Sequence, residues 1–534
     1  MGDEFSLLPA LLFITFFFFY YYIQRCSCEK KSSRKPPTKI SFFEMVKNKK
    51  RILEWTTELV LASPTNTITM PYTVITSNPK NIEHILMTNF HNYPKGDDFT
   101  AIFSELLGHG IINSDGDRWK LHRKAAGHEF NSKNLRTIIL DKAHNEVADR
   151  LVPLLSKAAA TGASLDLHDL LDRLAFDVIF QIVSEVDPAW LGYDKEENVD
   201  VVRFIHAYEV VMGAVNRRFN QPCFLWKLQR LLGIGSERRL KEEIGDVHEF
   251  AMKIVKQRKG RKPEELRSSG DFLSRCVLHG NSLDEFLRDI IINFVFAGWE
   301  TTPTAMTWFF WLVSTRPEVE EWILDEIDSV RERHENPDGK LTLDELREMD
   351  YLHAVLSETL RLYPPVPLCL RRCAEDDMLP DGTLVKKGWR VIYNSYAMGM
   401  MESIWGEDCK EFKPERWLEN GVFQPKSPYQ FPVFNAGPRT CLGKETAYIQ
   451  MKVFAANVIE KFSFDVAVKT EIEFVTTLNL KGGLLASVRR RSKGKEASDC
   501  LLVEVRSSLI MHSHPSKVDL QCRVPTAGIR APCS

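Results

Sequence analysis

The sequence predicts a mainly α-helical protein with small β-sheets, and three features support this. Several long stretches have the apolar spacing of buried or amphipathic helices, and these are residues 80–90, 164–186 and 237–260. Strand-like runs are few and short, and these are residues 72–77, 382–394 and 484–490. The chain has 534 residues, of which 44% are hydrophobic, so these helices can enclose a large core. We expect the main domain to span residues 41–490.

The first 24 residues predict a membrane anchor. The run from Phe5 to Ile23 carries no charge and is about long enough to cross a bilayer as a helix. Basic residues follow this run, and they are Arg25, Lys30, Lys31, Arg34 and Lys35. The alternative is a cleaved secretory signal, but such a signal carries its basic residues before the apolar run. The positive-inside rule then places everything after residue 24 in the cytosol.

The segments that flank the main domain differ from it in composition. Residues 25–40 are basic and contain Pro36 and Pro37, so they predict a linker. Residues 491–534 lack a sustained apolar period and predict a disordered tail. The net charge of −2 argues against a nucleic-acid-binding surface, and we expect no nucleic-acid partner. Eleven cysteines are scattered along the chain, which is poor support for a disulfide framework.

A single cysteine in the stretch FNAGPRTCLG, residues 434–443, is the strongest chemical feature. A structural zinc site needs four ligands, commonly in pairs, and no such pair lies nearby. One thiolate suffices where haem supplies the other ligands, because the porphyrin leaves the protein an axial bond to provide. A helical pattern follows at 443–462, and a helix N-terminus is expected to lower the pKa of the Cys441 thiol. The alternative is a buried structural cysteine.

The spacing F-x-x-G-x-R-x-C-x-G resembles the haem-binding signature of the cytochrome P450 family, and Cys441 falls on its proximal ligand. The resemblance implies the family's fold and a haem b with an axial thiolate. We expect Gly437 and Gly443 to let the backbone and the helix approach the cofactor. Arg439 is expected to pair with a haem propionate. Phe434 opens the same signature and is expected to contact the haem.

A second motif is AGWETT, residues 297–302, in a long apolar run whose one charge between Asp289 and Arg316 is Glu300. A second membrane span is the alternative, but an acid, several threonines and a proline make that costly, so we expect a buried helix. Ala297 and Gly298 leave room for a diatomic ligand. Thr301 can turn its hydroxyl from the backbone and open the helix locally. The run resembles the family's oxygen-binding groove, which implies that Thr301 hydrogen-bonds O₂ and that Glu300 relays protons.

Further motifs resemble structural parts of the same family. Glu358 and Arg361 share a helix face, and with Arg416 of the PERW stretch they resemble a lock below the haem, with a structural role. Trp119 and Arg123 also share a face and resemble a segment that holds a propionate. Arg371 is a weaker candidate for the same task, and an ordinary surface arginine is the alternative.

Other segments resemble a plant branch of the family that hydroxylates fatty acids and alkanes, and most closely its mid-chain alkane hydroxylases of cuticular wax synthesis. These segments are NYPKG (92–96), MTWFFWL (306–312) and IWGEDCKEFKPERW (404–417). The resemblance implies a monooxygenase anchored in the endoplasmic reticulum membrane with a cytosolic catalytic domain. It also implies O₂, a lipophilic substrate and NADPH-cytochrome reductase as partners. Apolar residues such as Phe99, Phe103 and Phe296 suit an aliphatic chain.

Two other functions remain open from the sequence. One is a haem-thiolate isomerase or dehydratase that acts on peroxides, which the Glu300–Thr301 pair disfavours. The other is a catalytically impaired haem protein from a truncated or misspliced gene. Residues 61–77 motivate this last hypothesis, because they look short for the family's first β-hairpin.

Overall fold

The computed structural model describes residue 44 and residues 47–130, 133–192, 199–278, 280, 283–468 and 470–491. The chain divides into two units, Met1–Arg489 and Arg490–Ser534, and the site described below lies in the first. The predicted anchor (1–24) and linker (25–40) lie outside the described residues, as does the tail beyond residue 491. Among the described residues, no helix combines the length and apolar character needed to cross a membrane.

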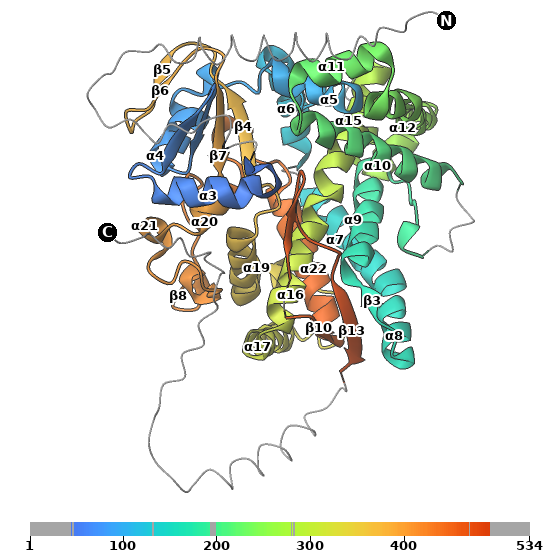
Figure 1. Ribbon diagram of the computed structural model, residues 1–534. Coiled ribbons are helices and arrows are strands. Elements are labelled where there is room, and N and C mark those ends of the chain that lie inside the picture. Colours follow the sequence, from blue (N-terminus) through green and yellow to red (C-terminus); the bar gives the residue numbers. More distant parts are fainter. Residues whose placement is uncertain are drawn as a thin grey trace, which may run out of the picture. The chain divides into compact units, whose positions relative to one another are not determined.

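A four-stranded sheet forms the β-rich side of the first unit, at the left of Figure 1, with the strand order β1-β2-β7-β4. Its strands are β1 Thr67–Met70, β2 Thr73–Thr76, β7 Arg390–Asn394 and β4 Leu368–Arg372. Strands β1 and β2 form an antiparallel hairpin, and β2 continues the sheet by parallel pairing with β7. Each strand of this hairpin has four residues, and all of them pair with the other strand. The hypothesis of an impaired protein stays untested by this pairing.

Helices make up most of the first unit and enclose its largest apolar core. The predicted helix at 164–186 is α9, Leu167–Ser184, whose side-chain cap Asp166 accepts a hydrogen bond from the amide of His168. The predicted helix at 237–260 is α12, Gly235–Lys259. The stretch at 80–90 is instead divided into three short pieces, and these are α4 Pro79–Glu83, the π-helix His84–Thr88 and the 3₁₀ helix Phe90–Asn92.

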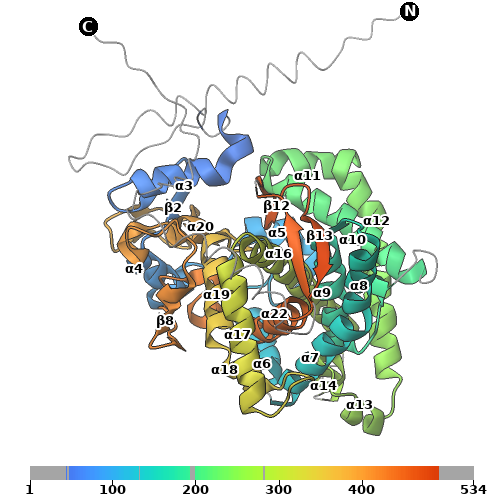
Figure 2. The ribbon, with the colours of Figure 1, turned by 90° about the horizontal axis from the view of Figure 1, so that it is seen from below.

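The apolar run with Glu300 forms two consecutive helices in the core, α15 Asp284–Trp299 and α16 Thr301–Ser314. Helix α16 packs against α9, α19 (Asp350–Leu362) and α22 (Lys444–Ile459), and Figures 1 and 2 show it among them. Most of its side chains are buried, so the run is a core helix, as expected. The two helices therefore place Glu300 and Thr301 in the interior of the first unit.

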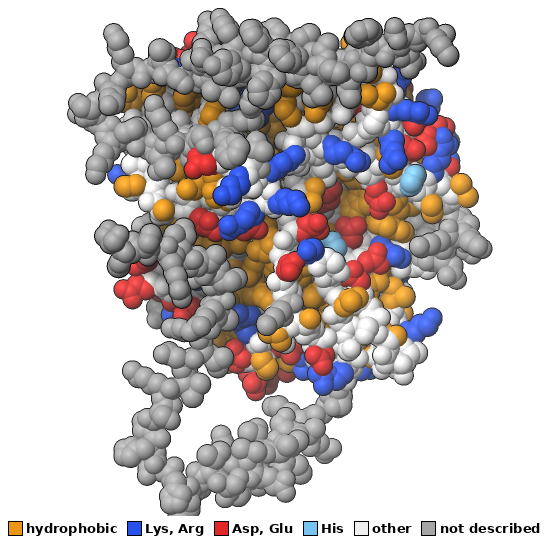
Figure 3. Space-filling model, viewed as in Figure 1, with side chains coloured by type: hydrophobic (Ala, Val, Ile, Leu, Met, Phe, Trp, Pro, Cys, Tyr) orange, Lys and Arg blue, Asp and Glu red, His pale blue; other side chains and the backbone are white. Residues whose placement is uncertain are grey.

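The other elements complete the framework around these helices. The other helices named below and in Figure 1 are α3 Ile52–Ala62, α5 Asp97–Leu107, α6 Gly116–Phe130, α7 Lys133–Glu146, α8 Val152–Thr161, α10 Val199–Phe219, α11 Cys223–Leu232, α13 Pro263–Ser269, α14 Phe272–Leu278, α17 Pro317–Arg333, α18 Leu343–Glu348, α20 Ser395–Gly399 and α21 Glu402–Trp405. The small strands are β3 Leu165–Asp166, β5 Asp377–Met378, β6 Leu384–Val385, β8 Leu418–Glu419, β9 Val422–Phe423, β10 Phe462–Val466, β11 Ile472–Phe474, β12 Leu478–Leu480 and β13 Leu485–Arg490. On the face seen in Figure 3, acidic and basic side chains are interspersed with apolar ones.

Candidate functional site

Cys441 lies in a tight loop immediately before α22. The loop contains two 3₁₀ turns, Pro432–Phe434 and Gly437–Arg439, and the amide of Cys441 donates to the carbonyl of Phe434 over 2.8 Å. The Cys441 side chain is exposed, although most of α22 that follows it is buried. The loop therefore presents the sulfur to an open space instead of packing it in the core.

Desolvation and neighbouring polar groups determine the acidity of the Cys441 thiol. Burial raises the pKa of Cys441, while the amide of Gly443, Arg123 and Lys444 act in the opposite direction. Desolvation thus outweighs the helix N-terminus, which is the opposite of the expected lowering of the pKa. The groups that favour a thiolate are nevertheless in place, and an iron cation adds to their effect.

The two glycines of the loop have a different purpose from the one predicted. Gly437 has a φ of +62°, and a β-carbon there would overlap the carbonyl oxygen of Leu86 in the π-helix. Its role is thus close packing between two backbones, not close approach to a cofactor. At Gly443 a β-carbon would lie 3.7 Å from the sulfur of Cys441, which is an ordinary contact. The geometry therefore does not require glycine at position 443.

A group of cations lies close to this loop. Arg439 pairs with Asp115 (Nη2–Oδ1 2.5 Å), and Arg371 reaches Asn435 (Nη2–Oδ1 3.4 Å). Both guanidinium groups are buried, and the Nε atom of each has no hydrogen-bond partner among the described residues. Burial and the two guanidiniums lower the pKa of Lys95 to about 7. Arg371, which was the weakest of the predicted propionate ligands, is thus buried and close to Arg439.

These charges fit the haem that the sequence predicts. Arg371 and Arg439 are cations, and Asp115 is the carboxylate that pairs with Arg439. Lys95 becomes a full cation only below its pKa of about 7, or where an anion binds beside it. Buried cations in excess are unfavourable unless an anion compensates them. The two propionate groups of a haem supply such charge, and the unpartnered Nε atoms of both arginines can donate to them. The residues present therefore fit a dianionic cofactor next to an exposed sulfur.

Trp119 and Arg123, both on α6, contact residues of the cysteine loop. The guanidinium of Arg439 lies 4.5 Å from the centre of the Trp119 ring, so Trp119 positions a cation that can bind a propionate. Arg123 donates from Nη1 to the carbonyl of Thr440 over 2.6 Å. Phe434 packs at 5.5 Å from the ring of Tyr448 on α22. Its predicted contact with the haem remains a proposal.

Sequence reasoning missed several residues of this region. Lys95 and Asp115 were not recognised, although Lys95 belongs to the NYPKG stretch that was used to assign the branch. Asn435 has a positive φ of 61°, and its Oδ1 accepts from the hydroxyl of Tyr393 over 2.9 Å. A lysine between proline and glycine gives no sign of burial in a sequence, so the missing information is tertiary.

The helix interruption at Glu300 brings together the residues predicted to handle oxygen. The hydroxyl of Thr301 donates to the carbonyl of Ala297 over 2.7 Å, so it is bonded to the backbone rather than turned from it. The helix is interrupted at Glu300 alone, whose backbone stays in the right-handed helical region (φ −85°, ψ −32°), since α15 ends at Trp299 and α16 begins at Thr301. The opening expected from Thr301 stays a prediction. Ala297 is exposed although its neighbours on α15 are mostly buried, so a space faces it.

Gly298 does not face that space. A β-carbon at Gly298 would lie 2.8 Å from Cγ1 of Ile179, which belongs to α9. The missing side chain therefore lets α9 pack against α15. The expectation that Gly298 leaves room for a diatomic ligand is not supported by this geometry, whereas Ala297 keeps that proposed role.

Glu300 lies in a poorly solvated environment between the two helices. Its Oε2 accepts from the hydroxyl of Thr476 over 3.3 Å. Burial raises the pKa of Glu300 to about 7, and the Thr476 hydrogen bond opposes this. A carboxyl group with a pKa close to neutrality can both accept and release a proton under working conditions.

The raised pKa of Glu300 predicts a stability that falls as the pH rises. The folded state binds this proton more tightly than the unfolded state, whose value is near 4.5. The stabilising contribution is therefore complete below that value and is lost as the pH rises through about 7. Glu300→Gln should reduce the difference between the melting temperatures at about pH 5.5 and about pH 7.5. An unchanged difference in the variant would contradict the assignment.

The predicted lock forms around Glu358 on α19. Its Oε1 accepts from Arg361 over 2.7 Å and from Arg416 over 2.8 Å, and its Oε2 accepts from Arg361 and from Trp417. The carboxylate and the Arg361 side chain are fully buried. Arg361 also donates to the carbonyl of Cys409 over 2.6 Å. The group thus ties α19 to the segment that contains residues 409–417.

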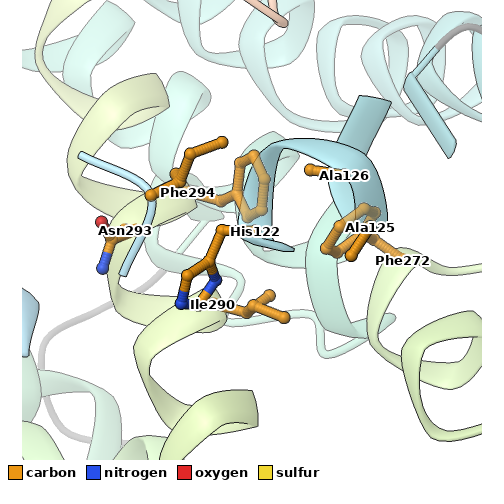
Figure 4. Close-up of a pocket in the computed structure, with 8 residues that line it drawn as sticks. His122, Ala125, Ala126, Phe272, Ile290, Asn293 and Phe294 are labelled. Carbon is orange, nitrogen blue, oxygen red and sulfur yellow. The ribbon is translucent and has the colours of Figure 1, made fainter. Parts of the chain in front are cut away.

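A small pocket lies before Ala297 along α15, and Figure 4 shows its lining. Its cavity volume is about 10 Å³, which is about the space of one water molecule. The lining residues are Ile111, His122, Ala125, Ala126, Phe272, Ile290, Asn293 and Phe294. The pocket is too small for an organic substrate, so we assign it no part in the reaction.

A mainly helical fold in which an exposed thiol lies beside buried cations fits a haem-thiolate enzyme. The chain belongs to the cytochrome P450 family, whose model matches residues 63–490. It is therefore a monooxygenase, an oxidoreductase with a thiolate-ligated haem, and it uses O₂ and a redox partner.

Related proteins narrow the position within the family. The chain is 52% identical to Cytochrome P450 CYP94D109 of Paris polyphylla over 466 residues, which are 85% of this chain and 92% of that protein. It is 49% identical to Cytochrome P450 CYP94D108 of the same plant over 475 residues, 88% of this chain and 94% of that protein. Cytochrome P450 94A1 of Vicia sativa is 41% identical over 469 residues, 84% of this chain and 89% of that protein. These relatives place the chain with family 94 and do not indicate the predicted mid-chain alkane hydroxylase group.

Proposed function

We propose that this monooxygenase hydroxylates the hydrocarbon chain of a long-chain fatty acid. The observation that carries the proposal is an aromatic wall made of Phe99, Phe103, Phe219 and Phe296. Phe103 is the centre of this wall, and its ring lies 5.0 Å from Phe99, 5.5 Å from Phe219 and 5.4 Å from Phe296.

The aromatic wall joins the surface to the oxygen-handling helix. Phe219, at the end of α10, is 40% exposed, whereas Phe296 directly precedes the exposed Ala297 on α15. A surface of this kind recognises a hydrocarbon chain by burial of apolar area, about 0.8 kcal/mol for each methylene group. It gives an extended aliphatic substrate a path towards Ala297.

The roles of the chain's own residues follow from their positions. The haem, when bound, supplies the redox chemistry that activates O₂, and we propose that Cys441 is its axial ligand. Arg371, Arg439 and Lys95 hold the propionates and fix the orientation of the porphyrin. Thr301 would turn its hydroxyl from the carbonyl of Ala297 to donate a hydrogen bond at the oxygen site, and Glu300 would supply protons to it. Membership of the family implies a redox partner, and we propose that NADPH-cytochrome reductase is this partner.

We also propose that the protein is anchored in the endoplasmic reticulum membrane. The support is the uncharged run from Phe5 to Ile23 and the basic residues that follow it. This arrangement leaves the catalytic unit in the cytosol, where NADPH is available. Fatty acids partition into the same membrane, so the anchor raises their local concentration near the enzyme.

The substrate proposal is tested with the purified full chain, a reductase, NADPH and an equimolar pool of fatty acids and alkanes. Mass spectrometry of the products should show hydroxylated fatty acids as the main species. Phe103→Ala should lower the ratio of long-chain to short-chain products, because the centre of the aromatic wall is lost. Mid-chain alcohols of alkanes as the main products would overturn the proposal in favour of an alkane substrate.

Replacing Thr301 with alanine should separate NADPH consumption from product formation. The hydroxyl that we propose as a hydrogen-bond donor at the oxygen site is lost, and product per NADPH should fall by about tenfold or more, with hydrogen peroxide released instead. Thr301→Ser keeps the hydroxyl and serves as the control. Simultaneous measurement of NADPH, peroxide and product checks this result. Unchanged coupling in Thr301→Ala would remove Thr301 from the proton route.

A further inference from the structure

A second half-buried carboxyl group lies near Glu300. Asp172 belongs to α9, which packs against both α15 and α16, and these helices lie together in Figure 1. The indole Nε1 of Trp299 donates to Oδ2 of Asp172 over 3.0 Å. Trp299 is the residue immediately before Glu300, so this hydrogen bond ties Asp172 to the interruption between the two helices.

Tyr208 of α10 packs against Trp299. Tyr208 on α10 is 2% exposed, and the centre of its ring lies 4.5 Å from that of Trp299. Within the described part of the chain, no hydrogen-bond partner reaches its hydroxyl. A buried hydroxyl without a partner is rare in native proteins and indicates a water molecule or a proton in transit. Neither the fold nor the haem site described above explains this hydroxyl.

The charges around these groups favour protonated acids. The charged groups that act most strongly on Asp172 are all acidic, namely Glu300, Asp169 and Glu209. Burial, with these charges, raises the pKa of Asp172 to about 8. Glu300 and Asp172 also raise the pKa of Tyr208, after burial itself. The groups that face this cluster are Asp169 and Arg173 of α9, Glu209 of α10, Trp299 of α15 and Thr476 between β11 and β12.

Asp172 is also within reach of solvent. Its side chain is partly exposed, Glu209 is exposed, and Asp169 keeps 47% of its side-chain surface accessible while it pairs with Arg173 over 2.8 Å. Glu300 is half-buried as well and lies between α15 and α16. The cluster thus extends from a partly exposed carboxyl group to the one next to Thr301.

We propose that Asp172 is the second acid of the proton route and recharges Glu300 through the hydroxyl of Tyr208. The protonated Asp172 gives its proton to the phenol oxygen through an intervening water molecule, while the phenol gives its own proton to the Glu300 carboxylate through a second water molecule. Asp172 then takes a proton from solvent, so every bond to hydrogen that breaks is replaced and no electron moves. The proposal rests on the proton role of Glu300 proposed above.

The test uses the haem-loaded full chain with Asp172→Asn, Tyr208→Phe and the conservative variant Asp172→Glu. Asp169→Asn is the matched control, because it removes an acid from the same helix that is already paired with Arg173. Infrared titration of the resting protein reports protonated carboxyl groups independently of turnover. In Asp172→Asn, one carboxyl band that titrates near pH 8 should disappear. In Glu300→Gln, the Asp172 band should titrate at lower pH, because the neighbouring Glu300 charge is gone.

Turnover gives the second readout. Hydrogen peroxide released per NADPH should rise at least about threefold in Asp172→Asn and in Tyr208→Phe, and Asp172→Glu should restore the wild-type value. Tyr208→Phe should leave the melting temperature unchanged, because the hydroxyl that it removes has no partner among the described residues. A merely structural role for Asp172 predicts a lower melting temperature with unchanged coupling, and this result would overturn the proposal.

Glu300→Gln separates the two proposals. If Glu300→Gln releases peroxide while Asp172→Asn stays coupled, Glu300 receives its protons by another route and the inference about Asp172 fails alone. If Glu300→Gln itself remains fully coupled, the proton role of Glu300 fails and the inference falls with it. Both results are obtained with the same assay.

Discussion

Replacing Cys441 with histidine should leave part of the haem bound but reduce monooxygenation at least about a thousandfold, which corresponds to about 4 kcal/mol in the activation barrier. The cations near the loop remain, so Arg371, Arg439 and Lys95 still attract the propionates. Imidazole donates less charge to iron than a thiolate does, and oxygen activation depends on that charge. The carbon monoxide spectrum of the reduced protein should lose its thiolate band.

A matched control for this variant is Cys409→Ser. Cys409 is buried near the lock, and its sulfur donates to the carbonyl of Met400 over 3.3 Å, which a serine hydroxyl can replace. This variant should keep the thiolate band and the activity. Retained monooxygenation in Cys441→His, or loss of the thiolate band in Cys409→Ser alone, would contradict the assignment of Cys441 as the axial ligand.

Glu358→Gln should lower the free energy of unfolding by about 3–5 kcal/mol, the cost of removing one partner from a buried ion pair. The carboxylate compensates Arg361, which is fully buried, and Arg416, which is nearly so. A neutral amide has the same shape but leaves both guanidinium groups without a counter-ion. The glutamine amide has one accepting oxygen, whereas both oxygens of the carboxylate accept hydrogen bonds. Trp417 donates to Oε2 of Glu358 and the amide of Lys413 donates to Oε1, so one of these donors loses its acceptor.

The loss is measured by chemical denaturation of the purified protein, with the haem content determined in parallel. Glu415→Gln is the control, because Glu415 lies next to Arg416 in the same turn but is exposed. It should change the free energy of unfolding by less than about 0.5 kcal/mol, as is usual for exposed residues. Equal stability of the wild type and Glu358→Gln would show that the lock is not a stabilising element.

The chemical motifs were predictable because each depends on residues that are close in sequence. The spacing from Phe434 to Gly443 places Cys441 directly before a helix, and the structure has that helix from Lys444. Thr301 and Pro303 break an apolar run, and the helix is interrupted there. Glu358 and Arg361 are three residues apart on one helix face and form two hydrogen bonds. Local geometry and a match to a family are sufficient for such features.

Residues that depend on long-range packing were misread or missed. Gly298 and Gly437 were interpreted as making room for a ligand, yet their missing side chains accommodate Ile179 and the Leu86 carbonyl. The predicted pKa of Cys441 had the wrong direction, because a sequence shows the helix that follows but not the atoms that desolvate the thiol. Asp172 was not predicted as a functional residue, because the sequence shows it only as one of several acids in α9. Its hydrogen bond from Trp299 becomes visible in the folded chain.

The sequence by itself therefore determined the class of enzyme, the cofactor and the family, because these depend on a few side chains at short and regular spacings. The tertiary structure decided which cations surround the cysteine loop, which glycines serve packing, and which acids lie behind Glu300. The physical reason is that burial and charge compensation depend on the sum of all neighbours in space. Arg439 lies 324 residues from Asp115 along the chain, and only the folded chain makes the two interact.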